Sequence, residues 1–372
     1  MLAPLTAVWL AATCPQGQVY PADDFVDRTA DAKLFRPEAV QALEDYAFTL
    51  TGADEERKGL RTDAVVILKN GELVYERYAR GSAASKRHIG WSVTKTFSNT
   101  LTGVAVAHGA VNIDEHLCAY LKLDAPDACA QVTVRHLLEF SSGFDWKELY
   151  ENQSNQESST LAMLYGVGHA DMASFVARHA LRDPPGTTYM YSTGESALLL
   201  STVNAAMKPR YGAEWPWTLL FEPLGMKSVV LERDASGGFS GGSHLFATAR
   251  DYARYGLFWL HDGCWNGKRI LPEGWAAQSK QISQGFKQKP LERDDGEVYA
   301  WQWTVNTAVP EVGQVERPFK TLPATEFAAR GHWGQSVTVL PEQGVVIVRL
   351  ADDRESGFDF EKFVTLALAV TP

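Results

Sequence analysis

Ser92 and Lys95 stand three residues apart in the stretch "GWSVTKTFSNTLTG", residues 90–103. The apolar residues after Ser92 recur at helical spacing, and residues three apart share one face of a helix. A serine hydroxyl is a poor nucleophile until a neighbour takes its proton, and a lysine in a dry site can lose its charge and act as that base. The pair therefore predicts acyl transfer, with Ser92 at a helix N-terminus whose N–H groups favour a developing oxyanion.

A single Ser-x-x-Lys pair is weak evidence, because about one such pair arises by chance in a chain of this length. The structural elements predicted around the pair therefore have to show whether it is catalytic or a chance occurrence. Residues 37–50, "PEAVQALEDYAFTL", predict a helix with a proline in its first turn. Residues 63–80 predict two strands joined by Asn70 and Gly71, because this dipeptide adopts the positive φ angles that a two-residue hairpin turn needs.

The helical pattern of residues 92–108 is followed by mostly helical patterns as far as residue 226. Residues 326–351 return to strand patterns around a turn at 341–344, and residues 357–370 predict a closing helix. Strands therefore lie toward both ends of the chain and helices fill its middle. We expect an α/β (α+β) fold in which an antiparallel sheet, built from both ends of the chain, is flanked by helices and carries an inserted, mostly helical domain.

The length of 372 residues is sufficient for two lobes around a large core. The predicted boundaries place residues 1–115 and 235–372 in a discontinuous α/β domain. Residues 116–234 form the predicted helical domain. We expect the active site between the two domains.

The net charge is -10, from 45 acidic and 35 basic side chains, and no basic run stands out. This composition argues against a nucleic-acid partner. The metal-binding patterns H-E-x-x-H and C-x-x-C do not occur, nor do the nucleotide-binding patterns G-x-G-x-x-G and G-x-x-x-x-G-K-[ST]. We therefore expect no metal, nucleotide or flavin cofactor, and a small-molecule substrate.

An apolar run at residues 2–12 resembles the core of a signal peptide, but no Lys or Arg precedes it. The run is too short to cross a membrane as a helix, and we expect no transmembrane segment. A weak or clipped export signal and a buried N-terminal segment both stay open. We expect a periplasmic or secreted protein, with a cytoplasmic location as the alternative.

The chain has four cysteines, an even number that is compatible with disulfides. Cys118 and Cys129 bracket a short loop, and we expect them to pair if the protein is exported. Closure of so short a loop stabilises a fold by about 2–3 kcal/mol in the chain-entropy model.

Several motifs follow the Ser-x-x-Lys pair in order. They are "VTVRHLLEFSSGFDW", "DPPGTTYMYSTGESALLL", "LFEPLGMKSVVLERDASGGFSGGSHLFATARDYARYG" and "GHWGQSVTVLPEQGVVIVRL". From about residue 37 to the end, the series closely resembles the serine β-lactamase-like hydrolases, whose first motif is Ser-x-x-Lys. It is most similar to the class C-related branch that holds family VIII esterases, D-aminopeptidases and 6-aminohexanoate-dimer hydrolases. The resemblance implies a β-lactamase/penicillin-binding-protein-like fold.

The resemblance implies that Ser92 is the nucleophile and Lys95 its partner. Tyr191, in "YST", matches the Tyr of the family's Tyr-x-Asn element and would take the Ser92 proton and later give it to the leaving group. Without the order of the motifs, a core aromatic residue would be the better interpretation of Tyr191. The two backbone N–H groups of the family's oxyanion hole carry over to Ser92 and Gln335.

Two departures from the family concern the substrate. His332, Trp333 and Gly334 stand where β-lactamases commonly carry Lys-Thr-Gly, and Thr193 stands where Tyr-x-Asn has its Asn. We expect His332 to line the pocket from a strand edge beside the nucleophile, and Gly334 to allow close approach of the backbone to the substrate. A histidine is only partly charged at neutral pH, so it binds a substrate carboxylate less firmly than a lysine. Tyr150 corresponds loosely to a Tyr that closes over substrate in the oligoamide hydrolases; a plain loop Tyr is the alternative.

We therefore expect a serine hydrolase, an esterase or amidase, that cleaves a small or medium ester, amide or peptide-like substrate through an acyl-enzyme. Trp91 and Trp333 are candidates for an apolar pocket wall, although core packing is equally open for Trp91. The alternative from another class is a penicillin- or peptidoglycan-sensing module that is acylated without efficient turnover. The presence of Ser92, Lys95 and Tyr191 together argues against this alternative.

Overall fold

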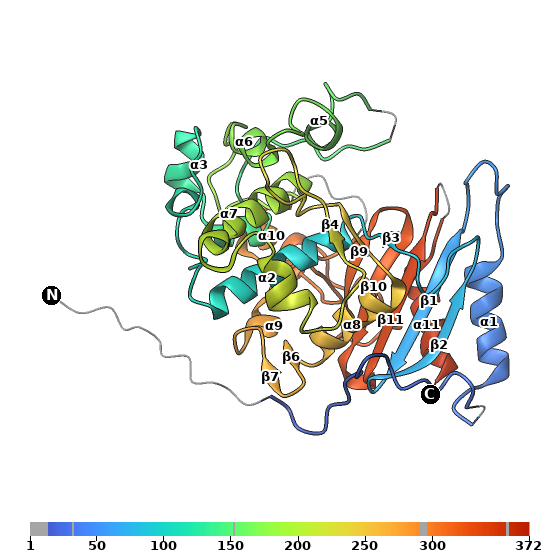
Figure 1. The fold of residues 1–372 in the computed structure, drawn as a ribbon. Helices are drawn as coiled ribbons and strands as arrows, with labels where there is room; N and C mark the ends of the chain where they lie inside the picture. The colour runs from blue at the N-terminus through green and yellow to red at the C-terminus, as the bar shows by residue number, and fades with distance from the viewer. Residues whose placement is uncertain (1–13, 32, 152, 291–295, 355–356, 372) are drawn as a thin grey trace.

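A six-stranded antiparallel sheet forms one side of the molecule (Figure 1). The computed structural model describes residues 14–371 apart from residues 32, 152, 291–295 and 355–356. The strand order is β2-β1-β11-β10-β9-β8, so β1 and β11, from opposite ends of the chain, pair in the sheet. The strands are β1 Thr62–Lys69, β2 Glu72–Tyr78, β8 Thr304–Val305, β9 Phe327–Gly331, β10 Gln335–Leu340 and β11 Val345–Ala351. The predicted antiparallel sheet, built from both ends of the chain, is confirmed.

Two predicted turns join neighbouring strands of this sheet. Asn70 and Gly71 have φ angles of 50° and 83° and connect β1 to β2. Gly344, with a φ angle of 62°, ends the turn between β10 and β11. Both turns are confirmed where the sequence predicts them, because each depends on residues that tolerate positive φ angles.

Helices cover both faces of the sheet. The helices α1 and α11 pack together on one face, where Leu43 and Phe363 are fully buried with Ile347. The helices α8 and α2 lie on the other face, and α8 comes so close that a Cβ on Gly256 would lie 2.4 Å from a Val346 methyl group. These helices are α1 Pro37–Phe48, α2 Val93–Ala107, α8 Ala249–Leu260 and α11 Phe360–Val370.

Helices joined by long loops form the regular structure described between α2 and residue 226, where the sequence predicts mostly helices. These helices are α3 Pro126–Gln131, α4 Val134–Leu138, α5 Ser159–Tyr165, α6 Met172–Ala177 and α7 Thr193–Tyr211, with the short turns η1 Leu117–Ala119 and η2 Trp217–Phe221. The longest of them, α7, packs against α2, α4 and α6. One apolar cluster continues from these helices through α2 to the sheet, and the exact domain boundaries stay a prediction.

A small three-stranded sheet holds the chain that leads into α2. Its central strand, β5, pairs with β3 and β4, and the Gly90 N–H donates to the Leu245 carbonyl at 2.8 Å. This pairing fixes the residues before α2 against β5. The remaining elements are β3 His88–Ile89, β4 Val230–Leu231, β5 Leu245–Ala247, β6 Cys264–Trp265, β7 Lys268–Arg269, α9 Trp275–Gln278, α10 Gln284–Gln288, η3 Pro310–Val312, η4 His332–Gly334 and η5 Pro341–Gln343.

The four cysteines form two disulfides. Cys118 pairs with Cys129, which confirms the prediction, and Cys14 pairs with Cys264 across 250 residues of sequence. The apolar run at residues 2–12 lies outside the described residues. Within the described part of the chain, no helix has both the length and the hydropathy needed to span a membrane.

Candidate active site

Ser92 stands at the N-terminus of α2, where the chain turns from β3 into the helix. The preceding residue, Trp91, has a left-handed φ angle of 47°, which residues other than glycine seldom adopt. Gly90 is packed so tightly that a Cβ would lie 2.6 Å from the Tyr252 hydroxyl. Among the described residues, none accepts a hydrogen bond from the Ser92 N–H. This N–H therefore remains available to a developing oxyanion at the positive end of α2.

Lys95 lies one turn further along α2 and is only 1% exposed. Its Nζ donates to Ser92 Oγ at 2.9 Å, to Thr193 Oγ1 at 2.9 Å and to the Gly242 carbonyl at 2.8 Å. These three acceptors match the three hydrogens of an ammonium group. Burial lowers the pKa of Lys95 to about 8, although the nearby Glu148 opposes this shift. Lys95 is thus close to the neutral form that can accept a proton from Ser92.

Tyr191 and Thr193 approach Lys95 from the start of α7. The Ser192 side chain caps this helix by accepting the Glu195 N–H at 3.0 Å, so Thr193 becomes its first residue. The ring centroid of Tyr191 lies 4.8 Å from Lys95 Nζ. The three residues predicted to be catalytic therefore lie in one cluster.

Gly242 reaches Lys95 because it has no side chain. A Cβ at this position would lie 2.5 Å from the Thr193 carbonyl oxygen, and any other residue would push the segment away from α7. The sequence analysis did not single out Gly242. The available signal was the glycine pair in "SGGS", which stands in one of the family-like motifs.

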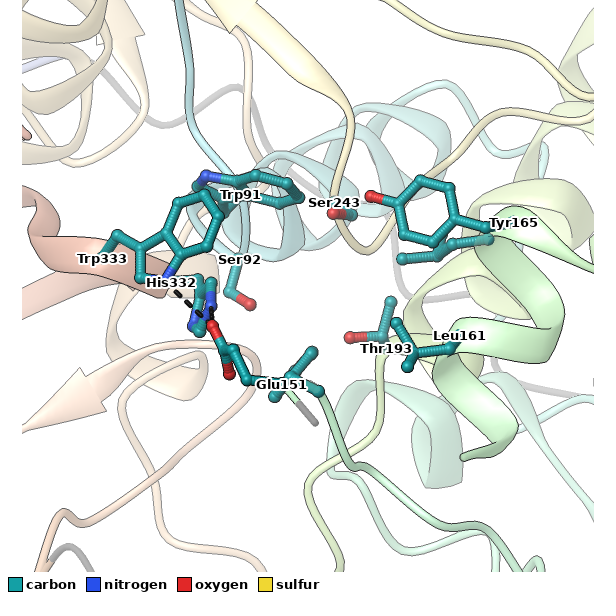
Figure 2. Close-up of a pocket in the computed structure, with 11 residues that line it drawn as sticks. Trp91, Ser92, Glu151, Leu161, Tyr165, Thr193, Ser243, His332 and Trp333 are labelled. Atoms are coloured by element: carbon teal, nitrogen blue, oxygen red, sulfur yellow. Dashed lines mark hydrogen bonds and ion pairs between the residues drawn. The ribbon is translucent and has the colours of Figure 1, made fainter. Parts of the chain in front are cut away.

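A cavity of about 210 Å³ opens beside Ser92, and Figure 2 shows the Ser92 hydroxyl directed into it. The cavity contains four of the five residues predicted to bind substrate. Its lining residues are Trp91, Ser92, Tyr150, Glu151, Leu161, Leu164, Tyr165, Thr193, Ser243, His332 and Trp333. Most of this lining is aromatic or aliphatic.

Aromatic rings build much of the cavity wall. Trp91 meets Trp333 edge to face with ring centroids 5.4 Å apart, and Tyr150 stacks on His332 at 5.1 Å. Tyr165 lies across the cavity from Trp333 and His332 (Figure 2). Such a surface suits an apolar group of a substrate.

His332 faces a carboxylate that the sequence did not reveal. Glu151 pairs with His332 Nε2 and accepts the Trp333 indole N–H at 2.9 Å (Figure 2). Burial raises the pKa of Glu151, but a hydrogen bond from its own backbone and the proximity of His332 outweigh burial and leave the pKa below its ordinary value. Glu151 therefore offsets the positive charge that His332 could offer to an anionic substrate group at this side of the cavity.

The segment that carries His332 is a turn, whereas the sequence pattern predicts a strand edge. Residues 332–334 form η4 between β9 and β10. Trp333 and Gly334 have φ angles of 59° and 87°, and these positive angles reverse the chain. The predicted strand is therefore wrong for these three residues, although His332 and Trp333 still line the cavity.

Gly334 is the last residue of this turn and Gln335 follows it, and neither residue lines the cavity. A Cβ on Gly334 would lie 2.3 Å from Arg349 Nη1, so the lack of a side chain there accommodates a buried arginine. The Gln335 side chain donates to the Ala351 carbonyl at 2.6 Å and accepts the Ala351 N–H at 3.0 Å. The substrate role of Gly334 and the oxyanion role of the Gln335 N–H stay predictions.

A second carboxylate, that of Glu148, lies between Tyr150 and Thr193. The hydroxyl groups of both residues donate to Glu148 Oε1. Burial and the charge of Glu148 raise the pKa of Tyr150 well above its ordinary value, so this hydroxyl keeps its proton. No motif in the sequence links Glu148 to Lys95, so Glu148 could not be predicted as a site residue.

The described part of the chain contains no cluster of three or more His, Cys, Asp or Glu side chains that could bind a metal ion. Glu151 and His332 pair with each other instead.

Comparison with known proteins agrees with this arrangement. The 6-aminohexanoate-dimer hydrolase of Paenarthrobacter ureafaciens is 27% identical over 246 residues, which are 64% of this chain and 62% of that protein. The chain thus matches less than two thirds of the length of this relative.

Two solved structures share the fold. The octameric penicillin-binding protein homologue from Pyrococcus abyssi has a TM-score of 0.64 at 17% identity, over 89% of this chain and 76% of that one. A class C beta-lactamase mutant has a TM-score of 0.57 at 15% identity, over 89% and 96%.

The profile of one family spans nearly the whole chain. Its description is Beta-lactamase, and it matches residues 39–371. This match includes the sheet, the helical region and every residue of the cavity. The chain belongs to the beta-lactamase family of hydrolases, as its motifs indicate.

Proposed function

We propose that this protein is a serine hydrolase that cleaves a small or medium neutral ester or amide through an acyl-enzyme on Ser92. One observation carries the proposal: the Nζ of the buried Lys95 lies 2.9 Å from Ser92 Oγ, at an aromatic cavity and at the N-terminus of α2. This arrangement supplies a nucleophile, an adjacent base and a site for the substrate.

In the proposed reaction, Ser92 Oγ attacks the carbonyl carbon of the substrate while Lys95 accepts the hydroxyl proton. The N–H groups of Ser92 and Gln335 hold the oxyanion. Tyr191, whose ring lies 4.8 Å from Lys95 Nζ, is coupled to this base and returns the proton to the leaving group. Water then enters, and the same groups release the acid.

The cavity favours a substrate with an apolar part and no negative charge near His332. Its volume is about 210 Å³ and its lining is mostly aromatic and aliphatic. Glu151, paired with His332, opposes a carboxylate of the kind that β-lactams carry. The Thr193 hydroxyl is already bonded to Lys95 and Glu148, so it offers less to a substrate amide than an asparagine would.

We also infer that the protein folds in an oxidising compartment, periplasmic or extracellular. The support is that its four cysteines form two disulfides. Disulfides persist mainly where glutathione and thioredoxin do not reduce them.

Replacement of Ser92 by alanine tests the proposed function. Ser92→Ala is expected to abolish hydrolysis of p-nitrophenyl butyrate and labelling by a fluorophosphonate probe, because both need the Oγ nucleophile. Intact-mass spectrometry checks the label and a chromogenic assay checks turnover. An adduct on the variant would contradict the assignment of Ser92. A wild-type protein that is acylated once and does not turn over would instead support the acyl-binding module.

Replacement of Tyr191 by phenylalanine tests the proposed proton transfer. Tyr191→Phe keeps the ring and its packing, so the melting temperature is expected to change little. The turnover of an amide substrate is expected to fall by roughly 10²–10⁴, the usual contribution of a positioned acid–base group. Tyr46→Phe is the control, because it removes a phenol hydroxyl on α1, where the group donates to the Asp359 carbonyl and lies outside the cavity. A Tyr191→Phe enzyme with nearly full amidase activity would show that Tyr191 is only a packing residue.

The preference for neutral substrates is the third expectation. The kcat/KM for p-nitrophenyl butyrate is expected to exceed that for a chromogenic cephalosporin by roughly five- to tenfold, since interactions of solvent-exposed charges are worth about 1 kcal/mol. Glu151→Gln removes the opposing charge and is expected to narrow this ratio. Equal specificity constants for the two substrates in the wild-type enzyme would refute the argument from Glu151 and His332.

A further inference from the structure

Five hydrogen-bond donors converge on the carboxylate of Glu148. Its Oε2 accepts the Trp146 indole N–H at 2.6 Å, the Thr160 hydroxyl at 2.7 Å and the Thr193 N–H at 2.9 Å. Its Oε1 accepts the hydroxyl groups of Tyr150 and Thr193. A carboxylate is purely an acceptor, so its two oxygens can serve all five donors. Glu148 is therefore held firmly beside the start of α7.

The Thr193 hydroxyl connects this carboxylate to Lys95. Its single hydrogen is directed at Glu148, so the oxygen can only accept from Lys95 Nζ, 2.9 Å away. The Gly242 carbonyl, 2.8 Å from Nζ, is also only an acceptor. When Lys95 is neutral it has two hydrogens, and these two acceptors use both of them. The lone pair of the amine is then left for its third neighbour, the hydroxyl of Ser92, 2.9 Å away.

We propose that Glu148 is a positioning residue: through the Thr193 hydroxyl it fixes the lone pair of neutral Lys95 toward Ser92 and stabilises the ammonium that forms when Lys95 takes the Ser92 proton. This proposal rests on the proposed function. The proton balance is simple. The Ser92 O–H bond breaks as Oγ bonds to the carbonyl carbon, and the proton goes to Nζ and later to the leaving group. Thr193 and Glu148 exchange no proton.

The electrostatics agree with this geometry. Burial lowers the pKa of Lys95 to about 8, and Glu148 is the group that opposes this decrease. Among the described residues, the other titratable groups around the network are Tyr150 and Tyr191, Glu195 on α7, and His332 and Glu151 across the cavity. Burial raises the pKa of Glu195 to about 8. These groups stay unchanged in the variants that test the proposal.

The sign of the pH effect follows from this arrangement. Acylation needs neutral Lys95, so its rate rises with pH through the pKa of Lys95. Removal of the Glu148 charge, or of the Thr193 oxygen that accepts from Nζ, makes the ammonium less stable and lowers this pKa. The midpoint of the rise therefore moves to lower pH, while the plateau rate falls because the lone pair is no longer directed at Ser92. A purely structural role of Glu148 would lower the rate without moving the midpoint.

The test is the acylation rate of the full-length protein, measured as the single-turnover release of p-nitrophenol from p-nitrophenyl butyrate between about pH 6 and about pH 10. Glu148→Gln and Thr193→Val are each expected to lower the plateau by about ten- to a hundredfold, the range for loss of one hydrogen bond to a charged group. Both are expected to move the midpoint down by roughly half to one pH unit. Thr193→Ser keeps the hydroxyl and is expected to restore the wild-type profile.

The matched control is Glu139→Gln, which changes another partly buried carboxyl group, one that accepts from the Trp301 indole N–H at 3.2 Å. It is expected to keep the wild-type plateau and midpoint. An unchanged midpoint in Glu148→Gln, or wild-type acylation by Thr193→Val, overturns the proposal. If Glu148→Gln does not fold, the proposal is tested by comparing the acylation profiles of Thr193→Val and Thr193→Ser. Failure of the proposed function is distinct, because the wild-type protein would then form no acyl adduct on Ser92.

Discussion

The ammonium group of Lys95 is almost entirely removed from water, so each of its hydrogens needs an acceptor inside the protein. The acceptors come from three segments that are far apart in sequence: Ser92 on α2, Thr193 on α7 and Gly242 in the segment before β5. The fold must bring these segments together within hydrogen-bond distance. The same burial that demands these partners also brings the pKa of Lys95 down to about 8, where the amine can work as a base.

The helices and strands around α2 hold these three segments close together. The sheet and α8 hold α2 from one side, and α7 packs on it from the other (Figure 1). Close contacts are possible because glycines stand where segments meet: Gly90 beside Tyr252, and Gly242 beside Thr193. A side chain at either glycine would separate the Ser-x-x-Lys turn from its partners. The precision of the site therefore depends on packing at positions that perform no chemistry themselves.

The parts of this structure that could be predicted from sequence have local signals. The hairpin at Asn70 and the helix that begins after Ser92 follow from spacing and turn chemistry within a few residues. Glu148 could not be found in this way, because its contacts with Thr193 depend on how a loop folds onto α7. The sequence pattern also did not predict the turn at residues 332–334, because a non-glycine residue, Trp333, has a positive φ angle there. Family resemblance identified candidate residues, but not the hydrogen bonds that orient them.

The most direct test of this account is an NMR titration of the Lys95 side chain in the full-length protein, with the signal assigned by comparison with a Lys95→Arg variant. We expect Lys95 to lose its proton with a midpoint near pH 8, because burial outweighs the stabilising charge of Glu148. A midpoint at or above the ordinary lysine value of about 10.4 would contradict it. Lys95 would then be a permanent ammonium at neutral pH, and Ser92 would need a different base.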